Sequence, residues 1–580
     1  MIELKGISVS PGIAKGKVFL FTEEKLTIPK YVVKIEEIEK EIKRFLEAIE
    51  KAIAEIKTIQ EKNSHELGDA ERSLLDSHIL MLNDPEFKSQ IGKKVEEKKY
   101  NVEWILLQEI EELVTKMNES TDEYLKARSL DFHDVSRRLI RQLLLQERMS
   151  LADLKEDIIL VAHNLLPSDA ISMNKKHVKG IALDLGSKTS HTAIIARSFN
   201  IPTVLGLSDI SQKVKNGDII IVDGNNGLVI IQPTKEITER YNENIARWHQ
   251  HEKKLHDLKK LPAITKDNKK IILSANIEVA EEVEIALKQG ADAIGLFRSE
   301  FLFMRPHTIP SEEEQFRAYK YVLEKMKDSP VTIRTLDLGG EKTIPGLEME
   351  EEENPILGWR AVRFCLAKPN IFKAQLRALL RASVYGNLRI MFPMISGIEE
   401  LLRTLDVVDE VKYELRREKY EFKSNIPIGA MIEVPAAALT SDVLARKVDF
   451  FSIGTNDLIQ YTIAVDRNNE KIAYLYQPFH PGVLRLIKMI IDNAHQAGIK
   501  VSMCGEMAGD PIATIVLLGL ELDEYSMSPY SLPEIKNIIR SVTFQEAKEL
   551  TQTILKMNFS YQIDEYVKSW LETRLALFAY

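Results

Sequence analysis

The run Asp449-Phe450-Phe451-Ser452-Ile453-Gly454-Thr455-Asn456-Asp457 shows the pattern on which the second half of the chain is built. Strand-forming residues are followed at once by a glycine and then by polar side chains. A short apolar run bounded by turn residues is typical of a buried strand. This strand would deliver Asn456 and Asp457 to the loop at its carboxyl end.

The same pattern recurs throughout residues 261–580. Strand-like runs alternate there with segments of helical length, at Lys270–Asn276, Ala293–Phe297, Val331–Thr335, Leu388–Pro393, Ile426–Glu433, Asp449–Ile453, Lys500–Cys504 and Asp523–Met527. Eight strands with intervening helices predict a (β/α)8 TIM barrel. In such barrels the chemistry takes place in the loops at the carboxyl ends of the strands.

An α/β module is predicted in the first half of the chain. Its strand-like runs are Ile158–Val161, Gly180–Leu183 and Ile219–Val222, separated by turns rich in Gly, Asn and Asp. Residues 1–20 contain a short strand, a Pro11-Gly12 turn and a second strand. We assign these two strands to the same module.

Residues 34–145 follow the period of a helix instead. Apolar residues recur there at spacings of three and four, at Ile35, Ile38, Ile42, Phe45, Leu46, Ile49, Ile53 and Ile56. Further helices are expected near 70–83, 86–118 and 122–147, because Asn-Asp-Pro at 83–85 and Asn-Glu-Ser at 118–120 interrupt the pattern. This antiparallel helical segment would be an insertion into the α/β module.

These patterns together predict a multidomain α/β protein. The α/β domain would comprise residues 1–20 and 148–233, and the helical subdomain residues 21–147. A charged helical linker at 234–260 would lead to the barrel at 261–580.

The composition is that of an ordinary globular protein, with 44% hydrophobic and 28% charged residues among 580. No apolar run approaches the ~20 residues of a membrane span, and the N-terminus lacks the pattern of a signal peptide. Two cysteines fit a reducing compartment. The net charge of −9 gives no basic surface for nucleic acid. We therefore expect a cytoplasmic protein that neither binds nucleic acid nor inserts into a membrane.

Charged side chains follow the predicted barrel strands, and each alone could form an ordinary salt bridge. They are Arg298, Arg334 with Asp337, Glu433, Asn456 with Asp457, Cys504 with Glu506, and Arg467 further along its loop. Arginines in this number indicate a substrate with several anionic oxygens, because guanidinium groups bind phosphate and carboxylate bidentately. The two carboxylates Glu433 and Asp457 suggest Mg²⁺. The substrate would be a small phosphorylated acid.

In the α/β module, residues 186–197 predict a polar turn that opens a helix and contains His191. A helix N-terminus stabilises anions, so a histidine there can carry a phosphoryl group. The alternative is that His191 merely lies next to an N-cap.

The motif Thr189-Ser190-His191-Thr192, with Ile201-Pro202 downstream, resembles the phosphohistidine motif of the Enzyme I family of the bacterial sugar phosphotransferase system, the phosphoenolpyruvate-protein phosphotransferases. Residues 295–304, 334–342, 354–360, 451–458 and 503–506 resemble that family independently. The resemblance covers essentially the whole chain.

The resemblance implies that His191 receives the phosphoryl group of phosphoenolpyruvate, with release of pyruvate, and passes it to a histidine of the phosphocarrier protein HPr. Substrate-binding residues would be Arg298, Arg334, Lys342, Asn456, Asp457 and Arg467. Glu433 and Asp457 would bind Mg²⁺, and Cys504 would protonate the enol. The barrels would pair into a homodimer, and HPr would dock on the helical subdomain near Asp69, Glu71, His78, Asp84 and Glu86.

Two departures from the family pattern leave the group that orients the His191 ring undetermined. Ser187 follows Gly186 where the family usually has a second glycine, and Ala170 stands where a threonine is common.

Two alternative functions remain. A pyruvate phosphate dikinase or phosphoenolpyruvate synthase shares the histidine module and barrel, but it also needs an ATP-binding domain, and no Gly-rich nucleotide loop occurs. A regulatory phosphoprotein that has lost catalysis is disfavoured by the intact set of barrel residues.

Overall fold

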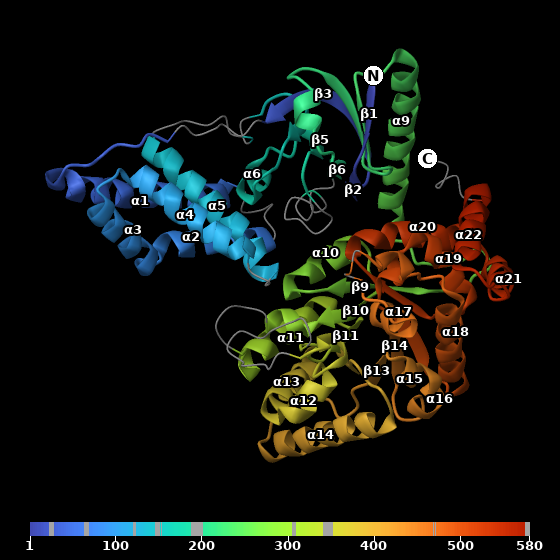
Figure 1. Ribbon diagram of the computed structural model, residues 1–580. Helices are drawn as coiled ribbons and strands as arrows, with labels where there is room; N and C mark the ends of the chain where they lie inside the picture. The colour runs from blue at the N-terminus through green and yellow to red at the C-terminus, as the bar shows by residue number, and fades with distance from the viewer. Residues whose placement is uncertain are drawn as a thin grey trace. The chain divides into compact units, whose positions relative to one another are not determined.

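The fold is given by a computed structural model of the chain (Figure 1). It describes residues 1–21, 28–62, 69–119, 123–144, 151, 154–186, 196, 201–303, 309–339, 352–467, 469 and 471–574, without the side chains of 61–74, 118–130, 167–168, 249 and 251. The chain forms two compact units, Met1–Gln250 and His251–Tyr580.

The second unit is built on a closed barrel of eight parallel strands. They are β9 (Ile272–Ile277), β10 (Ala293–Arg298), β11 (Pro330–Arg334), β12 (Asn387–Phe392), β13 (Ile428–Ile432), β14 (Phe450–Ile453), β15 (Lys500–Met503) and β16 (Glu524–Met527), with β16 pairing back to β9. Each predicted strand-like run overlaps one of them, so the predicted barrel is confirmed.

Helices surround this barrel (Figure 1). They are α10 (Val283–Lys288), α11 (Glu312–Met326), α12 (Val362–Ala367), α13 (Pro369–Ala382), α14 (Ile398–Arg417), α15 (Pro435–Leu439), α16 (Ser441–Leu444), α17 (Thr455–Ile463), α18 (Pro481–Gln496), α19 (Pro511–Gly519), α20 (Leu532–Ser541), α21 (Phe544–Ile554) and α22 (Ser560–Arg574). Helices cover the outside of the strands while side chains fill the inside, so β14 and β16 are buried along their whole length.

The first unit contains an eight-stranded sheet in the order β1-β8-β7-β3-β4-β5-β6-β2. Its strands are β1 (Ile2–Lys5), β2 (Ile7–Ser10), β3 (Ile13–Phe21), β4 (Ile158–Ala162), β5 (Val178–Leu183), β6 (Thr203–Leu205), β7 (Ile219–Asp223) and β8 (Leu228–Ile231). Short helices α6 (Pro167–Ser172) and α8 (Ile210–Lys213) accompany them.

The N-terminal segment differs from the single strand expected before Pro11. It forms two strands on opposite edges of the sheet, because β1 pairs with β8 and β2 pairs with β6. The chain changes direction at Gly6, where a Cβ atom would lie 2.5 Å from the Leu205 carbonyl oxygen. Only glycine allows this close approach, so Gly6 is required between the two strands.

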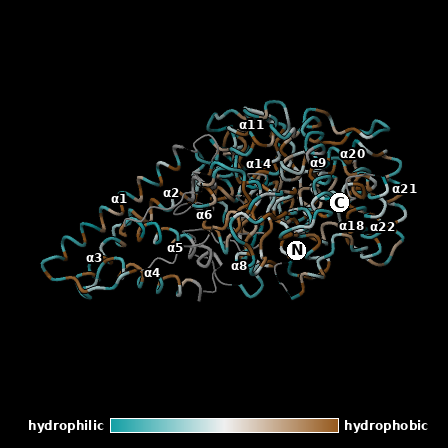
Figure 2. The backbone as a smooth tube through the Cα atoms, turned by 90° about the horizontal axis from the view of Figure 1, so that it is seen from above, coloured by the Kyte–Doolittle hydropathy of each residue, from teal (hydrophilic) through white to brown (hydrophobic). Residues whose placement is uncertain are grey.

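The helical subdomain is inserted between β3 and β4, which pair with each other in parallel. Its helices are α1 (Ile38–Lys62), α2 (Asp69–Asn83), α3 (Pro85–Lys98), α4 (Val102–Glu119) and α5 (Glu123–Leu144). In Figure 2 the tube of α1 changes repeatedly between teal and brown. Phe45, Ile49 and Ile56 of the predicted apolar stripe are buried, whereas Ile35 and Leu46 are exposed, so the stripe is confirmed in part.

The single helix expected over 86–118 is wrong, since the structure divides it into α3 and α4. Lys99 ends α3 in the left-handed conformation, with φ of 55°, and its N–H donates to the Val95 carbonyl. The buried Asn101 then accepts a hydrogen bond from the Tyr31 N–H at 3.0 Å and donates to the Pro29 carbonyl at 2.9 Å. This break depends on distant partners and not on a local glycine or proline.

Helix α9 (Lys235–Leu258) connects the two units. Ile237, Tyr241 and Ile245 on its first half pack against Ile13, Ile221 and Ile230 of the α/β sheet. None of the helices formed by the described residues is long and apolar enough to span a membrane.

Asn101→Ala is expected to destabilise the helical subdomain by about 2–3 kcal/mol, because it removes the buried side chain that bonds the Tyr31 N–H and the Pro29 carbonyl. Calorimetry and hydrogen exchange over residues 99–103 measure the effect. The control is Asn83→Ala, which removes only an exposed acceptor 3.3 Å from the Lys88 ammonium and should cost less than about 0.5 kcal/mol. Equal losses in the two variants would contradict this account of the break.

Candidate active site

The carboxyl ends of the barrel strands bring most of the predicted site residues to one mouth. Arg298 and Arg334 are the last residues of β10 and β11. Glu433 follows β13 directly, and Cys504 follows β15. Since the strands are parallel and the barrel is closed, these ends lie at the same side.

Arg334 is held by two carboxylates deep in this mouth. It is 6% exposed and lies 3.0 Å from Asp337, and its second ion pair is with the buried Glu300. Burial acts to lower the pKa of Arg334, but the charges of Glu300 and Asp337 raise it overall. The guanidinium therefore stays charged and keeps a fixed position.

Arg360 is the site residue to which sequence reasoning gave no role. Its guanidinium bridges two carboxylates, donating to Asp337 at 2.8 and 3.1 Å and to Asp457 at 3.1 and 3.2 Å. It does not follow a strand, and it lies just before α12. The motif 354–360 was the one signal that could have pointed to it.

Glu433 is 1% exposed and accepts a hydrogen bond from the Met394 N–H at 2.6 Å. Burial, together with repulsion from Asp457 and Asp337, raises the pKa of Glu433 to about 8. A Cβ atom on Gly454 would lie 2.6 Å from its Oε2. The absence of a side chain at Gly454 therefore keeps space open beside the carboxylate.

The carboxylates of Glu433 and Asp457 are suited to a hard divalent cation. Glu433 and Asp457 repel each other, and carboxylate oxygens are the ligands that Mg²⁺ prefers. Among the described residues no cluster of three or more His, Cys, Asp or Glu side chains could hold a metal. A cation here would thus use few protein ligands.

The remaining polar residues form ion pairs at the edge of the mouth. Arg298 donates to Glu278 at 2.7 Å, and Arg467 lies 3.3 Å from Glu506. Asn456 donates to the Glu506 carboxylate at 3.1 Å and accepts from its N–H at 2.9 Å. The Arg298 and Arg467 side chains are 33% and 40% exposed.

Cys504 lies in the barrel interior and is 4% exposed. Its side chain packs with Leu296, Met391, Met431 and Phe450. Burial raises the pKa of the Cys504 thiol, so it remains protonated at neutral pH.

Several predicted residues cannot be placed in this site. His191, Ser187 and Lys342 lie outside the described residues. Ala170 is buried in α6 and offers no hydroxyl.

The candidate partner residues of the helical subdomain fall into different environments. His78 is fully buried, 3.8 Å from Asp131, so its ring packs inside the subdomain instead of facing a partner. Asp84 caps α3 by accepting from the Glu86 N–H at 2.8 Å, and both side chains are exposed. The side chains of Asp69 and Glu71 are not described.

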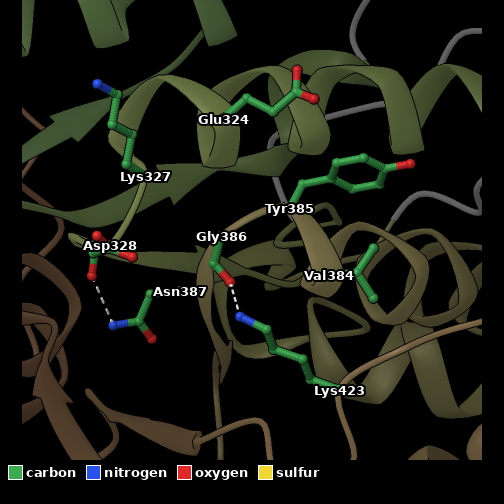
Figure 3. Close-up of a pocket in the computed structure, with 8 residues that line it drawn as sticks. All are labelled: Glu324, Lys327, Asp328, Val384, Tyr385, Gly386, Asn387 and Lys423. Carbon is green, nitrogen blue, oxygen red and sulfur yellow. Dashed lines mark hydrogen bonds between the residues drawn. The ribbon is translucent and has the colours of Figure 1, made fainter.

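A separate depression lies at the other end of the barrel, where β11 and β12 begin (Figure 3). It has a volume of about 620 Å³ and is lined by Glu324, Lys327, Asp328, Val384, Tyr385, Gly386, Asn387 and Lys423. Lys423 donates to the Gly386 carbonyl, and Asn387 donates to that of Asp328. Its polar groups thus bond within the protein, away from the arginine cluster.

An arginine-rich mouth with paired carboxylates on a (β/α)8 barrel defines an enzyme class that binds a small phosphorylated acid. Models of the PEP-utilising enzymes match this chain in three parts. The N-terminal domain model matches residues 5–128, the mobile domain model 154–227 and the PEP-binding domain model 252–544.

The phosphoenolpyruvate-protein phosphotransferase of Priestia megaterium is 42% identical over 98% of this chain and 99% of its own length. That of Bacillus subtilis is 43% identical over the same shares. A solution structure of an Enzyme I protein is 38% identical, covering 42% of this chain and 99% of its own, with a TM-score of 0.39. The chain belongs to the phosphoenolpyruvate-protein phosphotransferase family.

Arg360→Met is expected to lower the stability of the barrel by about 3 kcal/mol, because it removes the buried cation that Asp337 and Asp457 share beside Glu433. The calorimetric transition of the barrel measures this. The control is Arg363→Met, which removes a partly exposed pair 3.7 Å from Glu400 and should cost less than about 1 kcal/mol. A loss at Arg360 no larger than that at Arg363 would show that the bridge is not needed.

Proposed function

We propose that this chain transfers the phosphoryl group of phosphoenolpyruvate to its own His191, releases pyruvate, and passes the group to a histidine of the phosphocarrier protein HPr. This is the first general step of sugar uptake by the phosphotransferase system. The observation that carries the proposal is the cluster of Arg334, Arg360, Glu433 and Asp457 at the barrel mouth, in a chain of this family.

The arginines divide into two kinds. Arg334 and Arg360 are buried in bridges between carboxylates, so their positive charge is fixed before substrate arrives. Arg298 and Arg467 form partly exposed ion pairs. Such pairs are worth only about 0–1 kcal/mol, so the phosphate and carboxylate of a substrate can replace Glu278 and Glu506.

Glu433 and Asp457 would hold Mg²⁺ beside these arginines. When bound, Mg²⁺ supplies positive charge that offsets the negative oxygens of phosphate and enolate. Phosphoryl transfer depends mainly on alignment and on neutralising charge, which the arginines and Asn456 also support. Nε2 of neutral His191 would attack the phosphorus in line, and enolpyruvate would leave.

The enolate must then gain a proton at its methylene carbon to become pyruvate. Cys504 is the proposed donor, because its buried thiol stays protonated at neutral pH. Its sulfur would be left as a thiolate and would recover a proton from water.

One histidine cannot reach both the barrel and HPr from a single position. His191 belongs to the unit Met1–Gln250, and the arginine cluster belongs to His251–Tyr580. A movement between the units would take place within α9, and further movement at the junctions near 21 and 147, inside the first unit. These movements would present phosphohistidine to HPr, docked near Asp84 and Glu86. A cytoplasmic location fits these partners.

Incubation with ³²P-labelled phosphoenolpyruvate and Mg²⁺, without ATP, should label the intact protein with acid-labile, base-stable phosphate. His191→Ala should lose the label completely, and omission of Mg²⁺ should reduce it at least about tenfold. No label on the intact protein would favour the regulatory alternative. Label that survives in His191→Ala would mean that another residue is the nucleophile.

The barrels are further proposed to pair into a homodimer. Large apolar side chains are exposed on helices that pack together, at Leu439 on α15, Val443 on α16 and Met489 on α18. Apolar area of this kind is typical of an interface.

Leu439→Asp should weaken dimerisation at least about tenfold in sedimentation velocity, whereas the same change at the exposed Leu402 of α14 should not. Unchanged association would place the interface elsewhere.

A further inference from the structure

A hydroxyl group from the neighbouring strand contacts the thiol of Cys504. The hydroxyl of Ser452 on β14 donates to the Cys504 sulfur at 3.3 Å. The thiol itself donates to the Ile453 carbonyl at 3.9 Å, which is a long and weak contact. Ser452 therefore holds the Cys504 sulfur, while the hydrogen of the Cys504 thiol can turn to another acceptor.

The backbone around Cys504 prevents the sulfur from moving away from this hydroxyl. The Cys504 N–H donates to the Ile453 carbonyl at 3.1 Å. The Cys504 carbonyl accepts from the Asn276 amide at 3.0 Å, and Ser526 fixes that amide by donating to its oxygen at 2.6 Å. The N–H of Cys504 is thus held by β14 and its carbonyl by β9.

The hydroxyl of Ser452 has a different hydrogen-bond acceptor from the hydroxyl of the serine that pairs with it on the neighbouring strand. Ser502 on β15 lies opposite Ser452 in the register. Ser502 is also buried, but its hydroxyl donates to the Phe451 carbonyl at 3.2 Å. This is how a buried serine in a strand ordinarily satisfies its hydroxyl. The Ser452 hydroxyl donates to a thiol instead.

Charged side chains from three other strands shift the pKa of the Cys504 thiol. Burial raises the pKa of Cys504, the Ser452 hydroxyl lowers it, Arg334 and Arg298 lower it, and Glu433 raises it. A thiol whose pKa is too high is a poor acid. A hydrogen bond to the sulfur stabilises the thiolate that remains after the proton has left.

We propose that Ser452 is a positioning residue for proton donation, orienting the Cys504 thiol and stabilising its thiolate through the hydroxyl–sulfur hydrogen bond. This inference rests on the proposed function. In the step, the S–H bond breaks and its proton bonds to the methylene carbon of enolpyruvate. The carbon–carbon double bond supplies the electron pair, the enolate oxygen becomes the ketone, and sulfur keeps the pair of the broken S–H bond.

The test measures the rate at which iodoacetamide alkylates Cys504 in the full-length protein as a function of pH, quantified on its peptide by mass spectrometry. Only the thiolate reacts. In Ser452→Ala the midpoint should rise by about one pH unit, because a hydrogen bond to the thiolate is lost. In Ser502→Ala it should not move, and the buried Cys365 provides an internal reference in each digest.

Kinetics of pyruvate release provide the second readout. Ser452→Ala should lower kcat about tenfold with little change in KM for phosphoenolpyruvate, since it leaves the arginines intact and weakens only the acid. An unchanged alkylation midpoint in Ser452→Ala, or an equal shift in Ser502→Ala, would overturn the proposal. Faster alkylation at every pH without a shift would show a merely structural role.

Failure of the proposed function would give a different result. If the intact protein formed no pyruvate from phosphoenolpyruvate, the reaction assigned to the site would be wrong. The alkylation midpoint would still report whether Ser452 stabilises the thiolate, because that measurement does not depend on turnover.

Discussion

The bridge made by Arg360 between Asp337 and Asp457 is the interaction on which the site depends. Three carboxylates lie near one another here, since Glu433 is also repelled by both partners of Arg360. Without a buried guanidinium, such a cluster would repel itself or take up protons. With Arg360 and Arg334 present, the mouth keeps carboxylates that can hold a cation beside arginines that can hold an anion. The same charge balance thus accounts for both proposed ligands.

The barrel supplies the rigidity that this balance requires. Its strands are hydrogen-bonded to neighbours on both sides, and its interior is filled by side chains. A residue at the end of a strand therefore has little freedom to move. Arg334, Glu433 and Cys504 are buried at the ends of such strands, whereas Arg298, also at a strand end, and Arg467 form partly exposed pairs that can be exchanged. Fixed charge in the centre and replaceable charge at the edge suit a site that must bind and release a small anion repeatedly.

The division of the chain into two units separates the proposed phosphoenolpyruvate site from the proposed nucleophile, His191. A helical insertion in the first unit adds a surface of its own, while β3 and β4 on either side of it still pair in parallel. The α/β sheet therefore folds around the insertion without being interrupted. This arrangement allows one module to carry a phosphoryl group between two partners, as the proposed function demands.

The sequence by itself determined the barrel, the inserted helical subdomain and the strand-end residues, because strand and helix periods and turn residues are local signals. Tertiary structure alone decided the rest. Arg360 reaches Asp337 and Asp457 from a loop, so no periodicity marks it. Asn101 ends a predicted helix by bonding residues near 30, His78 turns inward, and Gly6 sends two short strands to opposite edges. Each depends on residues distant in sequence, whose proximity exists only after the chain has folded.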